Sequence, residues 1–516
     1  MIEQKKSLNA DEWIKLILGI AFLGGIFVRF YPVFRAGFPL NDGGMFLDMV
    51  RDLKASHYSL PEFTSYNYLK IPYAYPPFAF YVSRVLSDVF FFSEISLIQW
   101  LPPFINSLSI FVFYFLACEI LGSQSRGALA SAFYALTPAA FGWFVMGGGL
   151  TRSFGSLFTL LSILWVGRLF KVGGNKALVL SVVFCGLAIL SHPEAGIHTA
   201  AVCILLWLFF GRTRRSLIYA MIVGVGTILL SSPWWFTVIS YHGFTPFLSA
   251  LHTGSYGTSF LLAFYNLIFS RESFVPILVV LRIVSMIWAT WKKEYFLIFW
   301  VVIPYLVEPR SAPSIAFYPL CMLIALATFD ALPYIFSLFV HKNSKQNWEF
   351  HRSRTSNIFL ILLFMYLFVE SNFYGFKLVN NSLSKADLEA MSWVRRNLPA
   401  EGYFLPITGV PSPEIDPFIE WFPTLTGHHS QTTIQGYEWL LGEKFYDRYT
   451  DLSALQICES VLCVEEWSIR TNLSYDYIVL QKTALGQKLI DSFAASEKYK
   501  SIYSTRSVEI YLFNQK

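Results

Sequence analysis

Phe38-Pro-Leu-Asn-Asp-Gly-Gly-Met-Phe-Leu-Asp-Met, residues 38–49, directly follows the first strongly hydrophobic segment of the chain. It places one carboxylate, Asp42, just beyond an expected membrane boundary, beside two glycines that allow the backbone to turn sharply. An alternative interpretation is that Asn41 or Asp42 only caps the helix that follows, because both residue types favour that position.

The residues after this turn show helical spacing. Apolar side chains recur from Met45 to Leu53, while Asp48, Arg51 and Asp52 fall on the opposite side. This pattern predicts a short helix that lies in the membrane surface with its apolar face in the lipid. A carboxylate held at that interface suits chemistry on a lipid-linked substrate.

The composition places most of the chain in lipid. Of the 516 residues, 55% are hydrophobic and only 14% are charged, and the mean hydropathy is +0.49, whereas soluble proteins have about 25% charged residues. The sequence has no basic helix and no zinc-type Cys/His spacing, which argues against nucleic-acid binding. The first apolar run lacks a small-residue cleavage site, so we expect a retained span rather than a removed signal peptide.

Membrane crossings are predicted from apolar length, because a spanning helix needs about 20 mostly apolar residues. About eleven segments meet this criterion, two of them short. They are residues 13–30, 97–121, 127–145, 153–170, 177–190, 195–210, 216–239, 274–291, 295–307, 315–339 and 358–373.

Loop charge supports this count, because basic residues concentrate on the cytoplasmic side of membrane proteins. With the N-terminus inside, every basic cluster falls on the inner side if residues 76–92 do not span. Arg84 and Asp88 lie near the centre of that segment, where charges are costly, so we expect a second interfacial helix that begins at Pro76 and Pro77. Residues 259–270 are a weaker third candidate.

The tail after residue 373 is polar and, by the same count, lies outside the cytosol. Strand-like runs at residues 477–480 and 508–513 indicate a small α/β domain. We therefore predict a polytopic α-helical membrane protein with a transmembrane domain at 1–373 and an extracytoplasmic soluble domain at 374–516. Cys458 and Cys463 are the only cysteine pair in a polar region, and both a disulfide and two free thiols are compatible with the sequence.

Ionisable groups gather at the outer ends of the predicted spans, and each has a structural alternative. Arg152 and Arg310 could be snorkelling residues, and His192 could only end a helix. Glu308 and Arg310 could pair with each other, and Arg282 is predicted in the middle of a span. Trp234, Trp235 and Trp439 are interpreted as membrane-interface anchors. The outer-end set is Asp42, Arg152, His192, Glu194, Arg271, Glu272, Glu308 and Arg310.

Several short motifs resemble the C-type (GT-C) fold of integral membrane glycosyltransferases, in particular protein O-mannosyltransferases, lipid A aminoarabinose transferases and oligosaccharyltransferase catalytic subunits. The motifs are Asn41-Asp-Gly-Gly, Tyr75-Pro-Pro-Phe, Gly148-Gly-Leu-Thr-Arg, Leu190-Ser-His-Pro-Glu and Leu388-Glu-Ala-Met-Ser-Trp-Val-Arg-Arg-Asn-Leu-Pro.

This resemblance implies a polyprenyl- or dolichyl-phosphate sugar donor and an outward-facing site between the spans and the soluble domain. It implies that Asp42 acts as general base, or as the ligand of a divalent metal such as Mg or Mn. The chain departs from the pattern in two places. Gly43 stands where the mannosyltransferases have Glu, which puts metal dependence in question. The tail has Glu420-Trp-Phe-Pro and no Trp-Trp-Asp motif, which argues against asparagine glycosylation.

The sequence thus predicts a glycosyltransferase of the plasma membrane that acts on the outer face, with an acceptor of unknown class. Catalysis needs a base and cations that hold the phosphate, so Asp42 is the predicted catalytic residue. The predicted substrate-binding residues are Arg152, His192, Glu194 and Arg310, and further candidates are Asp48, Arg271 and Glu308. Two rival readings are a transporter or flippase of a lipid-linked saccharide, and an inactive member that serves as an assembly partner.

Overall fold

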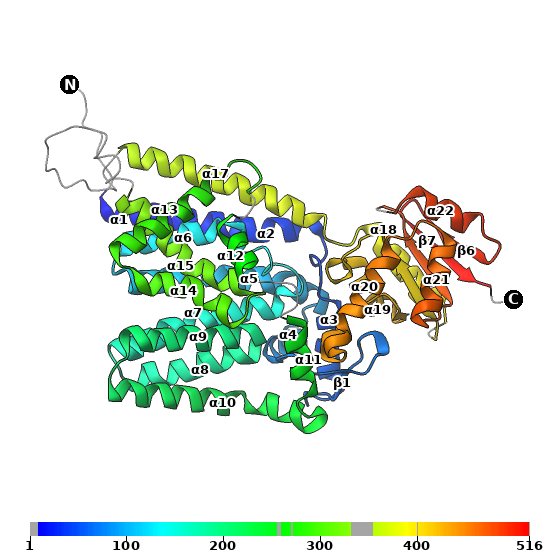
Figure 1. Ribbon diagram of the computed structural model, residues 1–516, viewed down its shortest axis with the longest axis horizontal. Coiled ribbons are helices and arrows are strands. Elements are labelled where there is room, and N and C mark those ends of the chain that lie inside the picture. The colour runs from blue at the N-terminus through cyan, green and yellow to red at the C-terminus, as the bar shows by residue number, and fades with distance from the viewer. Residues whose placement is uncertain are drawn as a thin grey trace.

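The computed structural model describes residues 9–254, 260–269, 272–331, 354–399, 401–483 and 485–514. It has two parts along its long axis, a bundle of long helices and a smaller α/β domain, with the loop after the first span between them (Figure 1). Arg271 lies outside the described residues, so its predicted role receives no structural account.

Among the described residues, seven helices are long and apolar enough to cross a membrane, and the chain is an integral membrane protein. They are Ala10–Ala36 (α1, η1 and α2), Glu94–Leu121 (α5), Gly149–Lys171 (α7), Pro193–Phe210 (α9), Arg214–His242 (α10), Ala312–Ala331 (α15 and η4) and Thr355–Val379 in α17. Shorter helices also occur in the bundle, namely Gln124–Ala135 (α6), Asn175–Ser191 (α8), Ile277–Lys292 (α13) and Tyr295–Val307 (α14). Each predicted span therefore contains a helix, while the total of eleven crossings stays a prediction.

Two predicted boundaries differ from the structure. The predicted span at 127–145 is not one helix, because α6 ends at Ala135 and Pro138 opens the 3₁₀ turn Pro138–Ala140 (η3). Proline restricts the residue before it and cannot continue a helix, so the chain turns here toward Gly147. The predicted domain boundary at 373 falls inside α17 (Arg354–Val379).

The loop between the first span and α5 contains the helix Gly44–Ala55 (α3), the hairpin strands Phe63–Thr64 (β1) and Ile71–Pro72 (β2), and the helix Phe78–Phe90 (α4). The expectation that α3 lies in lipid is wrong. Its apolar residues are buried in a protein core shared with α4, α5 and the C-terminal domain. In α4, the predicted interfacial helix, the buried Arg84 forms ion pairs with Asp88 and Glu94, which satisfies its charge.

The C-terminal part is built on a five-stranded mixed sheet in the order β4-β3-β5-β7-β6. Strand β3 runs parallel to β4 and β5, and β7 runs antiparallel to β5 and β6. Cys458, just after α20, and Cys463, in α21, form a disulfide. The strands are Tyr403–Ile407 (β3), His429–Ser430 (β4), Tyr477–Gln481 (β5), Tyr499–Ser504 (β6) and Val508–Phe513 (β7), and the helices are Lys385–Asn397 (α18), Pro417–Thr426 (α19), Phe445–Gln456 (α20), Val461–Thr471 (α21) and Gln487–Ala494 (α22).

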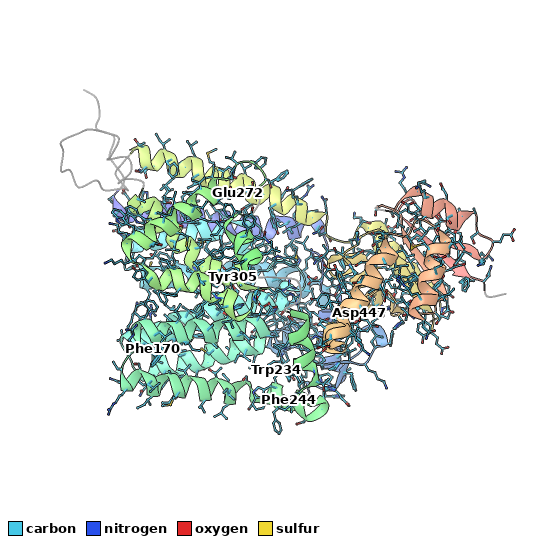
Figure 2. The ribbon with its side chains drawn as sticks, viewed as in Figure 1. Phe170, Trp234, Phe244, Glu272, Tyr305 and Asp447 are labelled. Carbon is cyan, nitrogen blue, oxygen red and sulfur yellow. A yellow bond between two sulfur atoms is a disulfide. The ribbon has the colours of Figure 1, made fainter. Side chains whose placement is uncertain are left out.

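Several contacts join the C-terminal domain to the rest of the chain, and two of them are made by α-helices outside the domain. Helix α19 packs on α3, and the helix Thr245–Gly254 (α11) packs on the short turns Tyr437–Trp439 (η7) and Gly442–Lys444 (η8). The Ser249 hydroxyl donates to the Glu438 carbonyl (2.8 Å) and accepts from the Gly442 N–H (2.7 Å). Figure 2 shows Trp234 and Phe244 at the end of the bundle that carries α11, with Asp447 across from them in the C-terminal domain.

Candidate active site

Asp42 lies in the loop between the first span and α3, where the bundle meets the C-terminal domain. Its Oδ1 accepts the backbone N–H of Gly148 (2.9 Å), and its Oδ2 accepts Nη2 of Arg152 (3.3 Å). The side chain is 21% exposed. Two donors from the start of α7 therefore orient the carboxylate and leave part of it accessible.

Glycines make this approach possible. A Cβ on Gly147 would stand 1.8 Å from the Asp42 carbonyl oxygen, and a Cβ on Gly148 would stand 2.1 Å from the Asp42 carboxylate. Gly43 has φ of 135°, a conformation that residues with side chains rarely adopt. The two glycine-containing motifs of the sequence therefore meet each other around Asp42.

Neither Asn41 nor Asp42 caps α3. The N-cap position belongs to Gly43, and the first N–H groups of the helix bond to Glu420 of α19. Its Oε1 accepts from Gly43 (3.3 Å) and Met45 (3.1 Å), and its Oε2 accepts from Gly44 (3.0 Å). Burial, and then the charge of Asp42, raises the pKa of Glu420 to about 8.

Arg152 turns toward the site instead of reaching for the membrane surface. Besides Asp42, its guanidinium donates through Nη1 to the Trp143 carbonyl (3.3 Å) and lies 5.6 Å from the centroid of the Trp143 ring. These two hydrogen bonds use two of its five N–H donors. The remaining donors can bind an anionic group beside Asp42.

His192 and Glu194 stand at the junction of α8 and α9, next to Tyr75. The His192 Nδ1 lies 3.9 Å from Glu194 Oε2, and the ring centroids of His192 and Tyr75 are 5.9 Å apart. Burial lowers the pKa of His192 to about 3, and the charges of Arg152 and Arg310 lower it further. His192 is therefore neutral at physiological pH and can donate or accept a hydrogen bond.

The turn between α14 and α15 presents Arg310. Glu308 does not form an ion pair with the Arg310 side chain but accepts the backbone N–H groups of Arg310 and Ser311 (both 2.9 Å). His198 Nε2 lies 2.9 Å from the Ser311 hydroxyl and 3.4 Å from Glu308 Oε2, which fixes the turn. Within the described part of the chain, the exposed Arg310 guanidinium has no hydrogen-bond partner, and its charge acts on His192 and Glu194.

The C-terminal domain adds residues that sequence reasoning did not assign to the site. Trp439 is 6% exposed and its ring packs edge-on against Tyr75 at 5.8 Å, so it is not a membrane anchor. Trp234, also expected to be an anchor, is 7% exposed and packs on Phe247. Glu438 is close enough to interact electrostatically with Arg310. No local pattern marks these residues, because the contacts depend on how the domain docks.

Two other candidates have structural contacts away from Asp42. Asp48 accepts from the Thr424 hydroxyl (2.8 Å) and from Arg51 Nη1 (3.1 Å), and burial raises its pKa to about 6. It therefore links α3 to α19. Arg282 donates to the Leu267 carbonyl (2.8 Å) at the end of Phe260–Ile268 (α12), which explains its position inside the bundle.

The residues around Asp42 do not fit a divalent cation well. Among the described residues no group of three or more His, Cys, Asp or Glu side chains is placed to hold a metal ion. Arg152 already occupies Oδ2 of Asp42, and the Glu420 oxygens accept backbone N–H groups. The positive charge next to Asp42 is that of an arginine.

The fold is similar to that of solved glycosyltransferases. Oligosaccharyltransferase AglB from Archaeoglobus fulgidus, solved with an inhibitory peptide and a dolichol-phosphate, is 13% identical, with a TM-score of 0.54 over 98% of this chain and 74% of its own. ArnT from Cupriavidus metallidurans, bound to undecaprenyl phosphate, is 15% identical, with a TM-score of 0.53 over 98% of both chains. The mycobacterial arabinofuranosyltransferase AftD is 13% identical, with a TM-score of 0.50 over 99% of this chain and 40% of its own.

No family model matches the sequence, and no curated protein matches it significantly. The likeness therefore lies in the three-dimensional arrangement, which extends over nearly the whole chain. The chain has the GT-C fold, as its short sequence motifs predicted.

Proposed function

We propose that this protein is a glycosyltransferase that moves a sugar from a polyprenyl- or dolichyl-phosphate to an acceptor on the outer face of the membrane. The observation that carries the proposal is the partly exposed Asp42 carboxylate, held by the Gly148 N–H and by Arg152 at the outer end of the bundle. A base and a cation thus stand side by side where a lipid phosphate at the outer surface can reach both.

In the proposed reaction a nucleophilic group of the acceptor attacks the anomeric carbon of the donor sugar. The bond from that carbon to the phosphate oxygen breaks, and the lipid phosphate leaves with the electron pair. Asp42 takes the proton that the acceptor loses, as a general base. Arg152 and Arg310 stabilise the charge that develops on the phosphate, and Arg is suited to this task because its planar group can bind two oxygens.

Arg152 has two tasks in this scheme. In the resting site its charge sits on Asp42. When a phosphate binds, the guanidinium can share its donors between the phosphate and the carboxylate. That sharing leaves Asp42 more basic when the substrate is present than when the site is empty. Neutral His192 and the Glu194 carboxylate supply hydrogen-bonding groups for sugar hydroxyls next to Asp42.

The comparisons support the donor class. AglB was solved with a dolichol-phosphate and ArnT with undecaprenyl phosphate, and both are transferases. Charges in the bundle argue against the transporter reading. Arg29 is fully buried in α2 and donates to the Asn106 side chain (2.6 Å) and to the Ala135 carbonyl (2.7 Å). A residue bound to fixed groups in this way holds helices together, whereas an ion or substrate pathway needs groups that are accessible.

The test is sugar transfer by purified protein in nanodiscs, with a radiolabelled polyprenyl-phosphate sugar as the probe, by wild type, Asp42→Asn and the control Asp447→Asn. Asp447 is exposed on the C-terminal domain. Removing a general base typically costs about 100-fold or more in rate, so we expect that loss in Asp42→Asn with donor binding retained, and wild-type rates in Asp447→Asn. Equal rates in all three would remove Asp42 from the chemistry. Donor movement across a vesicle without transfer would support a flippase.

A further inference from the structure

We infer that Glu420, which the C-terminal domain contributes, is a positioning residue that sets the location of Asp42, so that the transmembrane part has a complete active site only when this domain is docked. The inference rests on the proposed role of Asp42 as base. Glu420 itself touches no reacting group in this scheme, and it acts through the backbone of the loop.

The first argument is that Glu420 supplies what α3 lacks. The first N–H groups of a helix have no partner inside the helix. Here the N-cap is Gly43, which has no side chain to accept them. The Glu420 side chain, 2% exposed, accepts the N–H groups of three consecutive residues, Gly43, Gly44 and Met45.

The second argument is that α19 holds both sides of Asp42. Glu420 accepts from Gly43, the residue after Asp42, at 3.3 Å. The neighbouring Trp421 donates its indole N–H to the carbonyl of Asn41, the residue before Asp42, at 2.9 Å. Two adjacent side chains of one helix turn therefore fix the peptide groups that flank the catalytic residue.

The third argument concerns how α19 is itself held at this point. The Tyr66 hydroxyl, from the loop between the first span and α5, donates to the Glu420 backbone carbonyl at 2.7 Å. A Cβ on Gly44 would stand 3.0 Å from that same carbonyl oxygen, so α3 and α19 are packed as closely as their backbones permit. The Glu420 side chain is part of this close approach, because a Cβ on Gly44 would also stand 3.1 Å from its Oε2.

Protonation does not abolish this arrangement. The side chain uses only oxygen lone pairs in the three bonds, so it can accept them as a carboxylate or as a carboxylic acid. The pKa of Glu420 is raised to about 8, first by burial and then by the charge of Asp42. The contact with α3 explains why this acidic side chain is buried.

The experiment compares Glu420→Ala, Glu420→Gln and the control Thr424→Val in the nanodisc transfer assay. Thr424 lies on the same helix and bonds to Asp48 further along α3, so its loss weakens the same interface without freeing the start of α3. A misplacement of about 1 Å can cost about 100-fold in rate, so we expect kcat of Glu420→Ala to fall by that order while the donor KM stays within about twofold. Glu420→Gln should recover part of kcat, because its amide oxygen can still accept two of the three N–H groups. Thr424→Val should keep kcat within about twofold.

A second measurement does not depend on activity. Hydrogen exchange of the 43–45 backbone amides should be slow in wild type and Thr424→Val, and faster in Glu420→Ala. If kcat is unchanged in Glu420→Ala, or if Thr424→Val loses as much as Glu420→Ala, the positioning role is wrong. Unchanged exchange in Glu420→Ala would also contradict it. If wild type transfers no sugar but the variants show this exchange pattern, the proposed function is wrong, while the contact of Glu420 with the start of α3 still stands.

Discussion

At the scale of single residues, the environment of Asp42 depends on neighbouring glycines, which have no side chain. Two segments hold the Asp42 loop. The N-terminus of α7 contacts the Asp42 carboxylate through the Gly148 N–H, and Glu420 accepts the N–H of the next residue, Gly43. Only glycine at 147 and 148 leaves room for this. The charge of Arg152 then makes the carboxylate tolerable at a membrane boundary, where an unpaired charge would be costly.

Gly148→Ala tests this geometry directly. Gly148 itself has an ordinary helical φ of −66°, so the substitution strains no backbone angle and acts only through the added methyl group. That group would stand 2.1 Å from the Asp42 carboxylate and must displace it. We expect a loss of about 100-fold in kcat, measured by sugar transfer.

Gly224→Ala is the matched control, because a Cβ there meets nothing within 4 Å. It lies in α10 and should keep the wild-type rate. A wild-type kcat in Gly148→Ala would mean that Asp42 can move without consequence, and would contradict its proposed role as base.

In the sequence, a polar group that ends a hydrophobic run is the signal for a candidate site residue. Asp42 and Arg152 were chosen on that basis, and the structure brings them into hydrogen-bond distance. The same logic fails for Glu420 and Trp439. Their partners lie more than 300 residues away along the chain, and nothing in their local sequence indicates an outer loop as the partner.

At the scale of elements, α3 shows how the same amphipathic pattern can serve two environments. Its apolar face was expected to rest in lipid, but α4, α5 and α19 cover it. The spacing of apolar residues indicates only that one helix face is shielded from water, and either lipid or protein can shield it. The buried Asp48 on the other face distinguishes protein from lipid as the environment of α3. Its carboxylate needs a hydrogen-bond donor from the protein, and the Thr424 hydroxyl donates to it.

The α3–α19 interface should make stability depend on pH. Burial raises the pKa of Glu420 to about 8, above its value of 4.5 in an unfolded chain. The folded state therefore keeps a proton that the unfolded state loses, and the free energy of unfolding falls as pH rises between those two values, by at most about 1.4 kcal/mol per pH unit. Glu420→Gln lacks this proton, so its unfolding temperature in detergent should rise relative to wild type between pH 6 and pH 8.

The difference between the two proteins isolates Glu420 from other titrating groups. Asp48 and Asp416, whose pKa values burial raises to about 6, are present in both. A constant difference in unfolding temperature across this pH range would mean that Glu420 titrates at its ordinary value.

At the scale of the whole molecule, charge distribution and architecture indicate the same orientation. The basic residues at the start of α10, among them Arg214, lie at the end of the bundle opposite the C-terminal domain. The Cys458–Cys463 disulfide fits an oxidising compartment for that domain. We therefore expect the site and the domain to face outward.

Cysteine labelling checks this orientation. Glu497→Cys and Arg214→Cys both place a thiol at an exposed position, one in the C-terminal domain and one at the start of α10. A membrane-impermeant maleimide should label Glu497→Cys in intact cells and Arg214→Cys only after permeabilisation. Wild type, with its four free cysteines, gives the background. Labelling with the opposite preference would invert the topology and move the site to the cytosol.

Composition and apolar length predicted the fold class well because a bilayer leaves helices few alternatives. Helix limits were predicted less well. Pro138 lies just beyond the end of α6, within a run that remains apolar by composition, and α17 continues past the predicted end at residue 373 to Val379. These differences arise from the protein core, which can shelter irregular backbone and polar side chains that lipid would exclude.

The position of Glu420 also has a consequence for biosynthesis. Gly43 and Glu420 are separated by 377 residues, so the ribosome has released the Asp42 loop into the membrane long before the segment that orders it exists. A nascent chain, or one truncated ahead of α19, carries every charged group of the bundle and yet lacks the contact that shapes the loop. In the proposed scheme, folding of the C-terminal domain therefore completes the active site of the bundle, and a chain that lacks α19 stays inactive even where lipid donors are present.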